Sequence, residues 1–181
     1  MRKIVYLLTL ATTILIVAQP SYGSPDEPSR PEISSSTDGV TINGITWASR
    51  NVGVKGKFMD NPEDYGLLYD FEEAQTACPK GWRTPTQEEF ELLAAANNGW
   101  ATFNGINGRW FDNGGQAIFL PAAGYRNTSG AAYSQGSDGD YWSSTPLNAS
   151  YGSILSFYSS SVHPYGNSFY AYGFSVRCVR P

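Results

Sequence analysis

Two cysteines, Cys78 and Cys178, constrain the fold of this chain more than any other feature of its sequence. In an exported protein we expect two cysteines to be bonded to each other, and these two lie near opposite ends of the expected domain. Closing so long a loop stabilises the folded state by about 4 to 5 kcal/mol in the chain-entropy model. A redox or metal site is the alternative, but the sequence has no CxxC spacing and no histidine near either cysteine.

The disulfide is expected only if the chain is exported, and the N-terminal residues predict export. Met1-Arg2-Lys3 is a short basic stretch, an apolar run follows from Ile4 to Ala18, and small residues stand at Ser21 and Gly23. This is the order of a secretory signal peptide over residues 1–23, cleaved after Gly23. The apolar run is shorter than the roughly 20 residues of a membrane span, and an uncleaved anchor helix is the alternative. We therefore expect a periplasmic, cell-surface or extracellular protein, without membrane insertion after signal cleavage.

The mature chain divides into a tether and one domain. Residues 24–39 are rich in Ser, Pro and acidic residues with hardly any apolar ones, which predicts a flexible tether. The folded domain is expected over residues 40–181, which is long enough for one sizeable core. The net charge of −4 argues against a nucleic acid or an anionic membrane as the partner.

The periodicity of the domain indicates an α+β fold. An Asn43-Gly44 turn predicts an early hairpin. Capping boxes that begin at Asp70 and Thr86 predict helices from Phe71 to Ala77 and from Gln87 to Asn97. After Asn97 short apolar or alternating runs are split by Gly and Asn, which favours strands and a C-terminal antiparallel sheet. In the final strand Cys178 lies on the same face as Phe174 and Val176, where it can meet the end of the first helix at Cys78.

Four segments carry a resemblance to a known family: YDFEEAQTACPKGWRTPTQEEFELL from Tyr69, FLPAAGYRN from Phe119, YWSST from Tyr141 and FSVRCVRP from Phe174. Together they resemble the Fibrobacter succinogenes major paralogous domain over nearly the whole folded part. That family is similar to the C-type-lectin-like fold, which also contains formylglycine-generating enzymes and the variable proteins of diversity-generating retroelements. The resemblance implies a disulfide from the first helix to the last strand, a bacterial cell-envelope protein and a source among gut Bacteroidetes.

The sequence lacks the residues that carry metal binding and catalysis in those relatives. It has no EPN, QPD or WND tripeptide of the kind with which animal lectins hold calcium and sugar. Asp138 and Asp140 could supply oxygen ligands to a hard cation, but two acids around Gly139 are expected to be an ordinary loop. The single C-terminal cysteine is assigned to structure, and His163 is the only histidine. We therefore expect no enzyme, no catalytic residue, no cofactor and no metal.

The stretch from Leu147 to Tyr172 has the composition of a binding surface. It contains no Asp, Glu, Lys or Arg and is dominated by Ser and Tyr, as antibody loops are. Period-2 alternation predicts that Leu155 and Phe157 face the core while Ile154, Ser156 and Tyr158 face solvent. The alternative is a Ser-rich β region whose tyrosines pack in the core. The predicted ligand-binding residues are Asn148, Tyr151, Ile154, Ser156, Tyr158, Ser161, His163, Tyr165, Asn167, Phe169, Tyr170 and Tyr172.

The same stretch resembles the variable region of a diversity-generating retroelement target, which precedes the family's closing strand. Randomised adenines in AAC or AAT codons never yield Lys, Glu, Gln, Met or Trp, and the stretch contains none of the five. We therefore expect a receptor or adhesin with a diversified surface that binds a protein or glycan on a cell or phage surface. A fixed carbohydrate-binding or structural envelope module is the second hypothesis, and an enzyme related to the formylglycine-generating group is the third.

Overall fold

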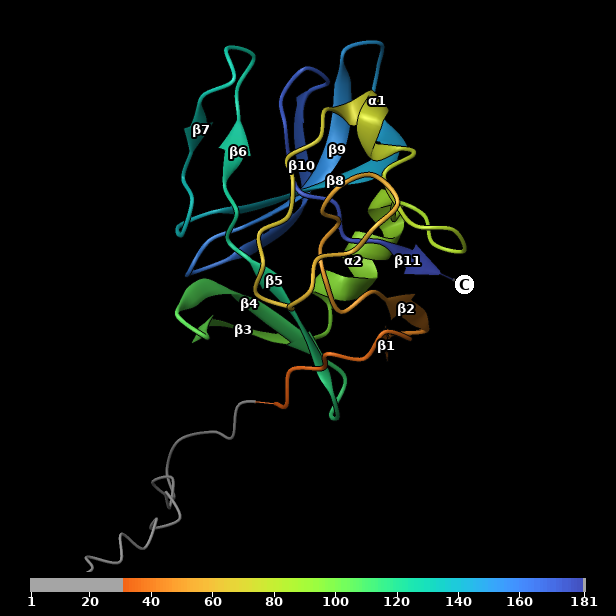
Figure 1. The fold of residues 1–181 in the computed structure, drawn as a ribbon, viewed down its shortest axis with the longest axis vertical. Coiled ribbons are helices and arrows are strands. Elements are labelled where there is room, and N and C mark those ends of the chain that lie inside the picture. The colour runs from red at the N-terminus through yellow and green to blue at the C-terminus, as the bar shows by residue number, and fades with distance from the viewer. Residues whose placement is uncertain (1–30, 181) are drawn as a thin grey trace, which may run out of the picture. The chain divides into compact units, whose positions relative to one another are not determined.

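The computed structural model describes residues 31–180 of the chain (Figure 1). The signal peptide predicted for residues 1–23 and the first part of the predicted tether lie outside this range. In chain order the elements are β1 (Val40–Ile42), β2 (Ile45–Trp47), α1 (Phe71–Ala74), α2 (Gln87–Ala94), β3 (Asn97–Phe103), β4 (Ile106–Asp112), β5 (Ala117–Pro121), β6 (Tyr125–Arg126), β7 (Ala132–Tyr133), β8 (Gly139–Pro146), β9 (Tyr151–Phe157), β10 (Val162–Phe169) and β11 (Val179–Arg180).

The strands form several small antiparallel sheets rather than one C-terminal sheet. Their orders are β1-β2-β11, β10-β9-β8, β3-β4-β5 and β6-β7. The described part of the chain is therefore mostly β, with two short helices early in the domain as predicted. In the first sheet β11 pairs with β2, with Val179 opposite Trp47. This pairing brings the two ends of the domain together.

Both predicted helices exist, and both begin at the predicted capping boxes. The Asp70 side chain accepts a hydrogen bond from the Glu73 amide, and Thr86 and Glu89 repeat the arrangement at α2. Each helix ends three residues before its predicted C-terminus. At α2 the Asn98 side-chain amide donates to the carbonyls of Ala94 and Ala96, which satisfies acceptors at the helix end. The chain can therefore leave the helix and enter β3 at Asn97.

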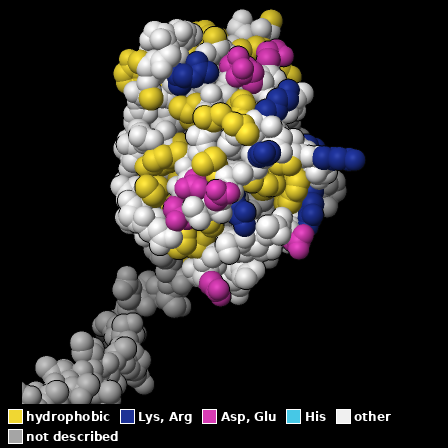
Figure 2. All heavy atoms as spheres, viewed as in Figure 1, with side chains coloured by type: hydrophobic (Ala, Val, Ile, Leu, Met, Phe, Trp, Pro, Cys, Tyr) yellow, Lys and Arg dark blue, Asp and Glu magenta, His cyan; other side chains and the backbone are white. Residues whose placement is uncertain are grey.

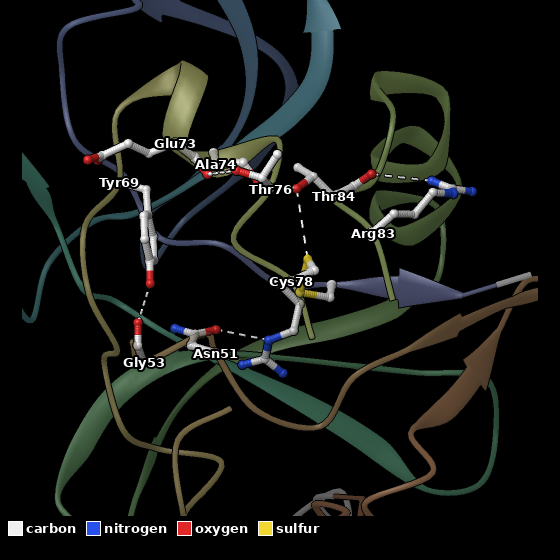
Figure 3. The surroundings of a disulfide bond; sticks show 11 residues. Asn51, Gly53, Tyr69, Glu73, Ala74, Thr76, Cys78, Arg83 and Thr84 are labelled. Atoms are coloured by element: carbon white, nitrogen blue, oxygen red, sulfur yellow. Dashed lines mark hydrogen bonds between the residues drawn. A yellow bond between two sulfur atoms is a disulfide. The ribbon is translucent and has the colours of Figure 1, made fainter. Parts of the chain in front are cut away.

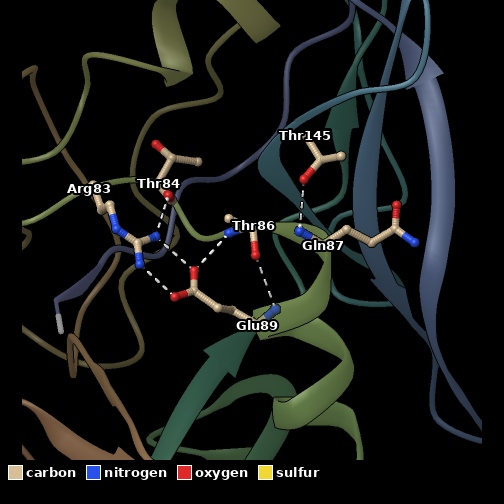
Figure 4. Close-up of polar contacts among 6 residues, drawn as sticks. All are labelled: Arg83, Thr84, Thr86, Gln87, Glu89 and Thr145. Atoms are coloured by element: carbon tan, nitrogen blue, oxygen red, sulfur yellow. Dashed lines mark hydrogen bonds and ion pairs between the residues drawn. The ribbon is translucent and has the colours of Figure 1, made fainter.

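An ion pair fixes the start of α2 (Figure 4). Arg83 donates to both carboxylate oxygens of Glu89, at 2.7 and 2.6 Å, and Glu89 also accepts from the Thr86 amide at 2.8 Å. Burial of Glu89 raises its pKa, but the bonds from Arg83 and Thr86 outweigh burial and leave the pKa below its usual value. The Gln87 amide donates to Thr145 Oγ1 on β8 at 3.0 Å. These contacts attach α2 to the preceding loop and to the central sheet.

The Cys78–Cys178 disulfide is present, as predicted (Figure 3). It joins the loop after α1 to the residue before β11, and the two Cα atoms are 6.0 Å apart. Next to it, the Thr84 hydroxyl donates to the Ala74 carbonyl at 2.6 Å, which ties the loop to the end of α1. The bridge therefore links the first helical region to the last strand and closes most of the domain into one covalent loop.

The β8-β9-β10 sheet separates two hydrophobic clusters. Tyr141 and Leu155 belong to the first, together with Phe90 and Leu93 of α2. Their neighbours Trp142 and Ile154 belong to the second, together with Phe71 of α1 and Phe174. Because successive strand residues point to opposite faces, this alternation means that both faces of β8 and β9 are covered.

Part of the segment predicted as a tether is bound to the domain. The Ser34 amide donates to the Ala117 carbonyl at 2.8 Å, and the Ala117 amide donates to the Glu32 carbonyl at 2.9 Å. Ser34 is buried. The composition of this segment lacks apolar residues, but backbone groups on a sheet edge can bind an extended chain whatever its side chains. Residues 32–34 therefore form a parallel bridge with the first residue of β5.

Candidate functional site

The β9–β10 hairpin carries most of the predicted ligand-binding residues. In β9 every residue after Tyr151 is buried, whereas β10 alternates strictly between half-buried and exposed residues. β10 is an edge strand, paired only with β9, and its register shifts by one residue between His163 and Gly166. A proline and a bulge are typical of edge strands that do not add further strands. Its exposed residues, here called the β10 strip, are His163, Tyr165, Asn167 and Phe169.

The solvent exposure predicted for Ile154 and Ser156 is wrong. Both are buried, with 6% and 8% of their surface exposed. Ile154 packs in the second hydrophobic cluster, and Ser156 lies opposite Asp140 on β8. Alternation correctly placed these residues on the face opposite Leu155 and Phe157. That face is covered by α1 and by the segment around Phe174, so neither face of β9 is free.

The remaining predicted residues lie along the whole hairpin and not in one cluster. At the turn are Tyr158, Ser161 and His163. Tyr165 and Asn167 follow on β10. At the far end, around the start of β9 and the end of β10, are Asn148, Tyr151, Phe169, Tyr170 and Tyr172. Strands of this length separate the two ends by roughly 20 Å.

Arg109 bonds to the backbone of the turn between β9 and β10. This buried side chain donates to the Tyr158 carbonyl at 3.0 Å and to the Asn98 side-chain oxygen at 2.6 Å. Burial lowers its pKa. Above it, the Tyr158 and His163 rings are 5.7 Å apart, and His163 Nε2 lies 2.9 Å from Ser161 Oγ. The buried Arg109 therefore fixes the backbone of the turn, while the side chains of Tyr158 and His163 remain exposed.

Tyr170 has a structural role at the far end of the hairpin. Its ring stacks on Phe71 of α1, with centroids 4.1 Å apart and planes 4° apart. Its hydroxyl donates to the Asn148 carbonyl at 2.8 Å, and its own carbonyl accepts from the Phe71 amide at 2.9 Å. Tyr170 therefore connects α1 to the end of β10, and only part of its ring is accessible to a ligand.

A series of aromatic contacts continues from this end onto the β6–β7 hairpin. Ring centroids are separated by 4.3 Å for Tyr151–Phe169, 6.0 Å for Phe169–Tyr172, 6.0 Å for Tyr172–Tyr125 and 5.5 Å for Tyr125–Tyr133. We call these five residues the aromatic row. Tyr125 and Tyr133 were not predicted from the sequence. The signal that could have found them is their position on either side of the polar turn Asn127-Thr128-Ser129-Gly130.

Backbone pairing holds the two parts of the aromatic row together. The Arg126 amide donates to the Gly173 carbonyl at 2.9 Å, and the Gly173 amide donates to the Arg126 carbonyl at 2.8 Å. β6 is therefore bonded directly to the segment that follows β10. The row is a single structural unit and not a chance contact between two loops.

The charge around the hairpin differs from that elsewhere on the molecule. From Leu147 to Tyr172 there is no Asp, Glu, Lys or Arg. On the face seen in Figure 2, by contrast, Lys, Arg, Asp and Glu side chains lie among small hydrophobic patches. The predicted site is thus aromatic and rich in hydroxyl groups, with neither acidic side chains nor lysine or arginine.

The acids predicted as a possible cation site lie in different surroundings. Asp140 is buried in β8, whereas Asp138 precedes the strand and is half-buried. A Cβ atom at the intervening Gly139 would collide with the Phe157 ring, so this glycine makes room for core packing. Burial raises the pKa of Asp140 to about 6, with a further rise from Asp138 and an opposing hydrogen bond from Ser156. Among residues 31–180 no group of three or more His, Cys, Asp or Glu is placed to hold a metal ion.

Comparison with known proteins gives one result. The family model described as the Fibrobacter succinogenes major domain matches residues 32–180, which is nearly all of the described chain. The match includes residues 32–34, which bond to Ala117 at the start of β5. No curated protein and no solved structure gives a significant match. Within the described residues, no helix is long and apolar enough to cross a membrane.

Proposed function

The chain belongs to the Fibrobacter succinogenes major domain family, and from this premise we propose that it is an exported ligand-binding protein of the bacterial envelope, a receptor or adhesin. The observation that carries the proposal is the β10 strip. An edge strand here presents aromatic and polar residues without charge, and Tyr165 is 67% exposed. Exposed aromatic side chains on a rigid hairpin are typical of binding surfaces, because they lose little conformational entropy on binding.

We propose a C-type-lectin-like fold for the domain. Its support is the disulfide from the loop after α1 to the end of the chain, together with the pairing of β11 with β2. Together these two features join the two ends of the domain. Fold alone does not identify a ligand, so the functional proposal depends on the surface residues.

The place where the chain enters the domain supports display on a surface. Residues 32–34 pair with the start of β5 at one end of the domain, and Figure 1 shows the tip of the β6–β7 hairpin at the other end. The chain therefore enters the domain at the end opposite the tip of the β6–β7 hairpin. Signal cleavage after Gly23 and export are part of the same proposal.

Diversification of the surface is the finer form of this proposal, and a fixed module is the alternative. The composition of the stretch from Leu147 to Tyr172 favours diversification. Burial of Ile154, Leu155 and Phe157 favours a fixed sequence at those positions. A reverse-transcriptase gene next to a near-copy of the codons for residues 141–177, differing almost only at adenines, would support diversification. If no such near-copy is present, the fixed module is the better description of this surface.

Binding by the turn end can be tested with a triple variant, Tyr158→Ala, His163→Ala and Tyr165→Ala. These three residues are exposed, so the variant should fold. The protein from residue 24 onward, carrying a fluorescent label, is mixed with bacterial cells and with host epithelial cells, and bound label is measured by flow cytometry. We expect the triple variant to lose most of the binding, because anchor residues carry much of the energy of an interface. Equal binding by both proteins would contradict the assignment.

A further inference from the structure

The aromatic row forms a continuous surface that the β9–β10 hairpin alone does not provide. Its most open members are Tyr133, which is 46% exposed, and Phe169, which is 48% exposed. The middle residues Tyr125 and Tyr172 are half-buried, and their rings lie 6.1 and 6.4 Å from the core residue Phe174. The row is thus anchored at its centre and accessible along its length.

Most of the phenol groups in the row have unused hydrogen-bonding capacity. The hydroxyls of Tyr125, Tyr151 and Tyr172 bond to no residue that the structure describes, whereas the Tyr133 hydroxyl accepts from the Asn127 side chain at 3.3 Å. Each phenol can donate one hydrogen bond and accept others. The row therefore alternates apolar ring surface with polar groups that a ligand could use.

The charges near the row do not point to an ionic ligand. Strands β6 and β7 together contain one charged residue, Arg126. A Cβ atom on Gly173 would lie 2.8 Å from Arg126 Nε, so the guanidinium lies against the backbone at that glycine. The cation is thus packed along the chain beside the row and is not a free group at its end.

We propose that the aromatic row is a binding site for a neutral glycan chain. Sugar rings carry no charge and combine apolar C–H faces with hydroxyls, which matches ring surfaces that alternate with phenol groups. The row consists of five rings that contact one another in series, whereas a stable protein–protein contact buries roughly 800 Å² on each partner. A narrow, extended and uncharged surface therefore fits a linear polymer better than a globular partner. The inference deepens the proposed function and rests on it.

The proposal can be tested by affinity electrophoresis in native gels that contain single neutral polysaccharides: a mixed-linkage β-glucan, a mannan, a xylan and a galactan. We expect at least one of them to retard the protein. Tyr133→Ala and Phe169→Ala, which remove the two most exposed rings of the row, should each weaken the interaction by about tenfold, the effect of losing one anchor residue. Val54→Ala is the control, because Val54 is 59% exposed in the loop between β2 and α1 and belongs to neither the aromatic row nor the β10 strip.

Thermal unfolding of each variant checks that the fold is intact, and Tyr133 is suitable because it is well exposed on a surface hairpin. Retardation by none of the four polysaccharides would overturn the inference, as would retardation that both row variants leave unchanged. A protein that binds cells through Tyr158, His163 and Tyr165 but binds no polysaccharide would overturn this inference and leave the proposed function standing. A protein that binds neither would contradict both.

Discussion

Replacing Asp140 with Asn should stabilise the protein at neutral pH and remove part of the pH dependence of its stability. Asp140 is 7% exposed and lies on β8 opposite Ser156 of β9, inside the sheet that carries the candidate site. Burial raises the pKa of this carboxyl from 3.8 to about 6, Ser156 opposes the rise with a hydrogen bond, and Asp138 adds to it. At neutral pH the folded protein therefore contains a buried carboxylate that is short of partners.

The size of the effect follows from the difference between the two pKa values. Each pKa unit corresponds to 1.36 kcal/mol, so the shift costs the folded state about 3 kcal/mol once Asp140 is ionised in both states. Between about pH 4 and pH 6 the folded chain keeps this proton while the unfolded chain has lost it. The contribution to stability is therefore fully present below about pH 4 and is lost as the pH rises through 6. An asparagine has no such dependence.

The assay is urea unfolding, followed by tryptophan fluorescence, of the Asp140→Asn variant and the parent protein at pH 4 and pH 7.5. The free energy of unfolding of the variant minus that of the parent should increase by about 2 kcal/mol between these two pH values. Taking the difference cancels the other titrating groups, Glu89 among them. A difference that is the same at both pH values would refute the reasoning, because it would mean that Asp140 titrates alike in both states.

Asp138→Asn provides a second measurement on the same carboxyl. Since the charge of Asp138 raises the pKa of Asp140, its removal should move the loss of stability to lower pH without abolishing it. A transition that stays in place would mean that burial alone sets the pKa of Asp140.

Three further predictions concern the scaffold. Without reductant, neither Cys78 nor Cys178 should react with iodoacetamide in the unfolded protein, and reduction should lower the free energy of unfolding by up to about 4 to 5 kcal/mol; labelling without reduction would contradict the bond. Thr86→Ala should cost about 1 kcal/mol in urea unfolding through the lost helix cap, with ligand binding retained. Tyr170→Ala should cost about 3 kcal/mol because its ring stacks on Phe71, whereas Tyr165→Ala should cost less than about 0.5 kcal/mol. Similar melting temperatures for these two variants would rule out the structural role of Tyr170.

The features that the sequence predicted correctly depend on few residues or on covalent chemistry. A capping box requires only a side chain and a backbone amide three residues away, so Asp70 and Thr86 mark the helix starts whatever packs around them. Two cysteines leave one way to form an intramolecular bond. Family motifs were equally reliable, and the family model matches residues 32–180.

The features that it missed depend on distant parts of the chain. Arg177 is an example, because its charge in FSVRCVRP suggests a surface residue and yet its side chain is fully buried. It donates to the Asn51 side chain at 2.9 Å and to the carbonyls of Ala48 and Phe119 at 3.0 and 2.8 Å. Burial lowers its pKa to about 10. Three segments far apart in sequence must meet before this arginine has partners.

The predicted exposure of Ile154 is wrong because it too depends on packing by distant segments. Its burial limits which positions of the site can vary. Alternation places Ile154 and Leu155 on opposite faces of β9, but only the packing of α1 and Phe174 decides that both faces are covered. A buried side chain tolerates few changes in volume, whereas exposed positions tolerate most. If the stretch from Leu147 to Tyr172 is diversified, variation that preserves the fold must therefore concentrate on the β10 strip and the turn, and the β9 codons should stay nearly constant. Composition cannot reveal this division, because Ser and Tyr occur on both sides of it.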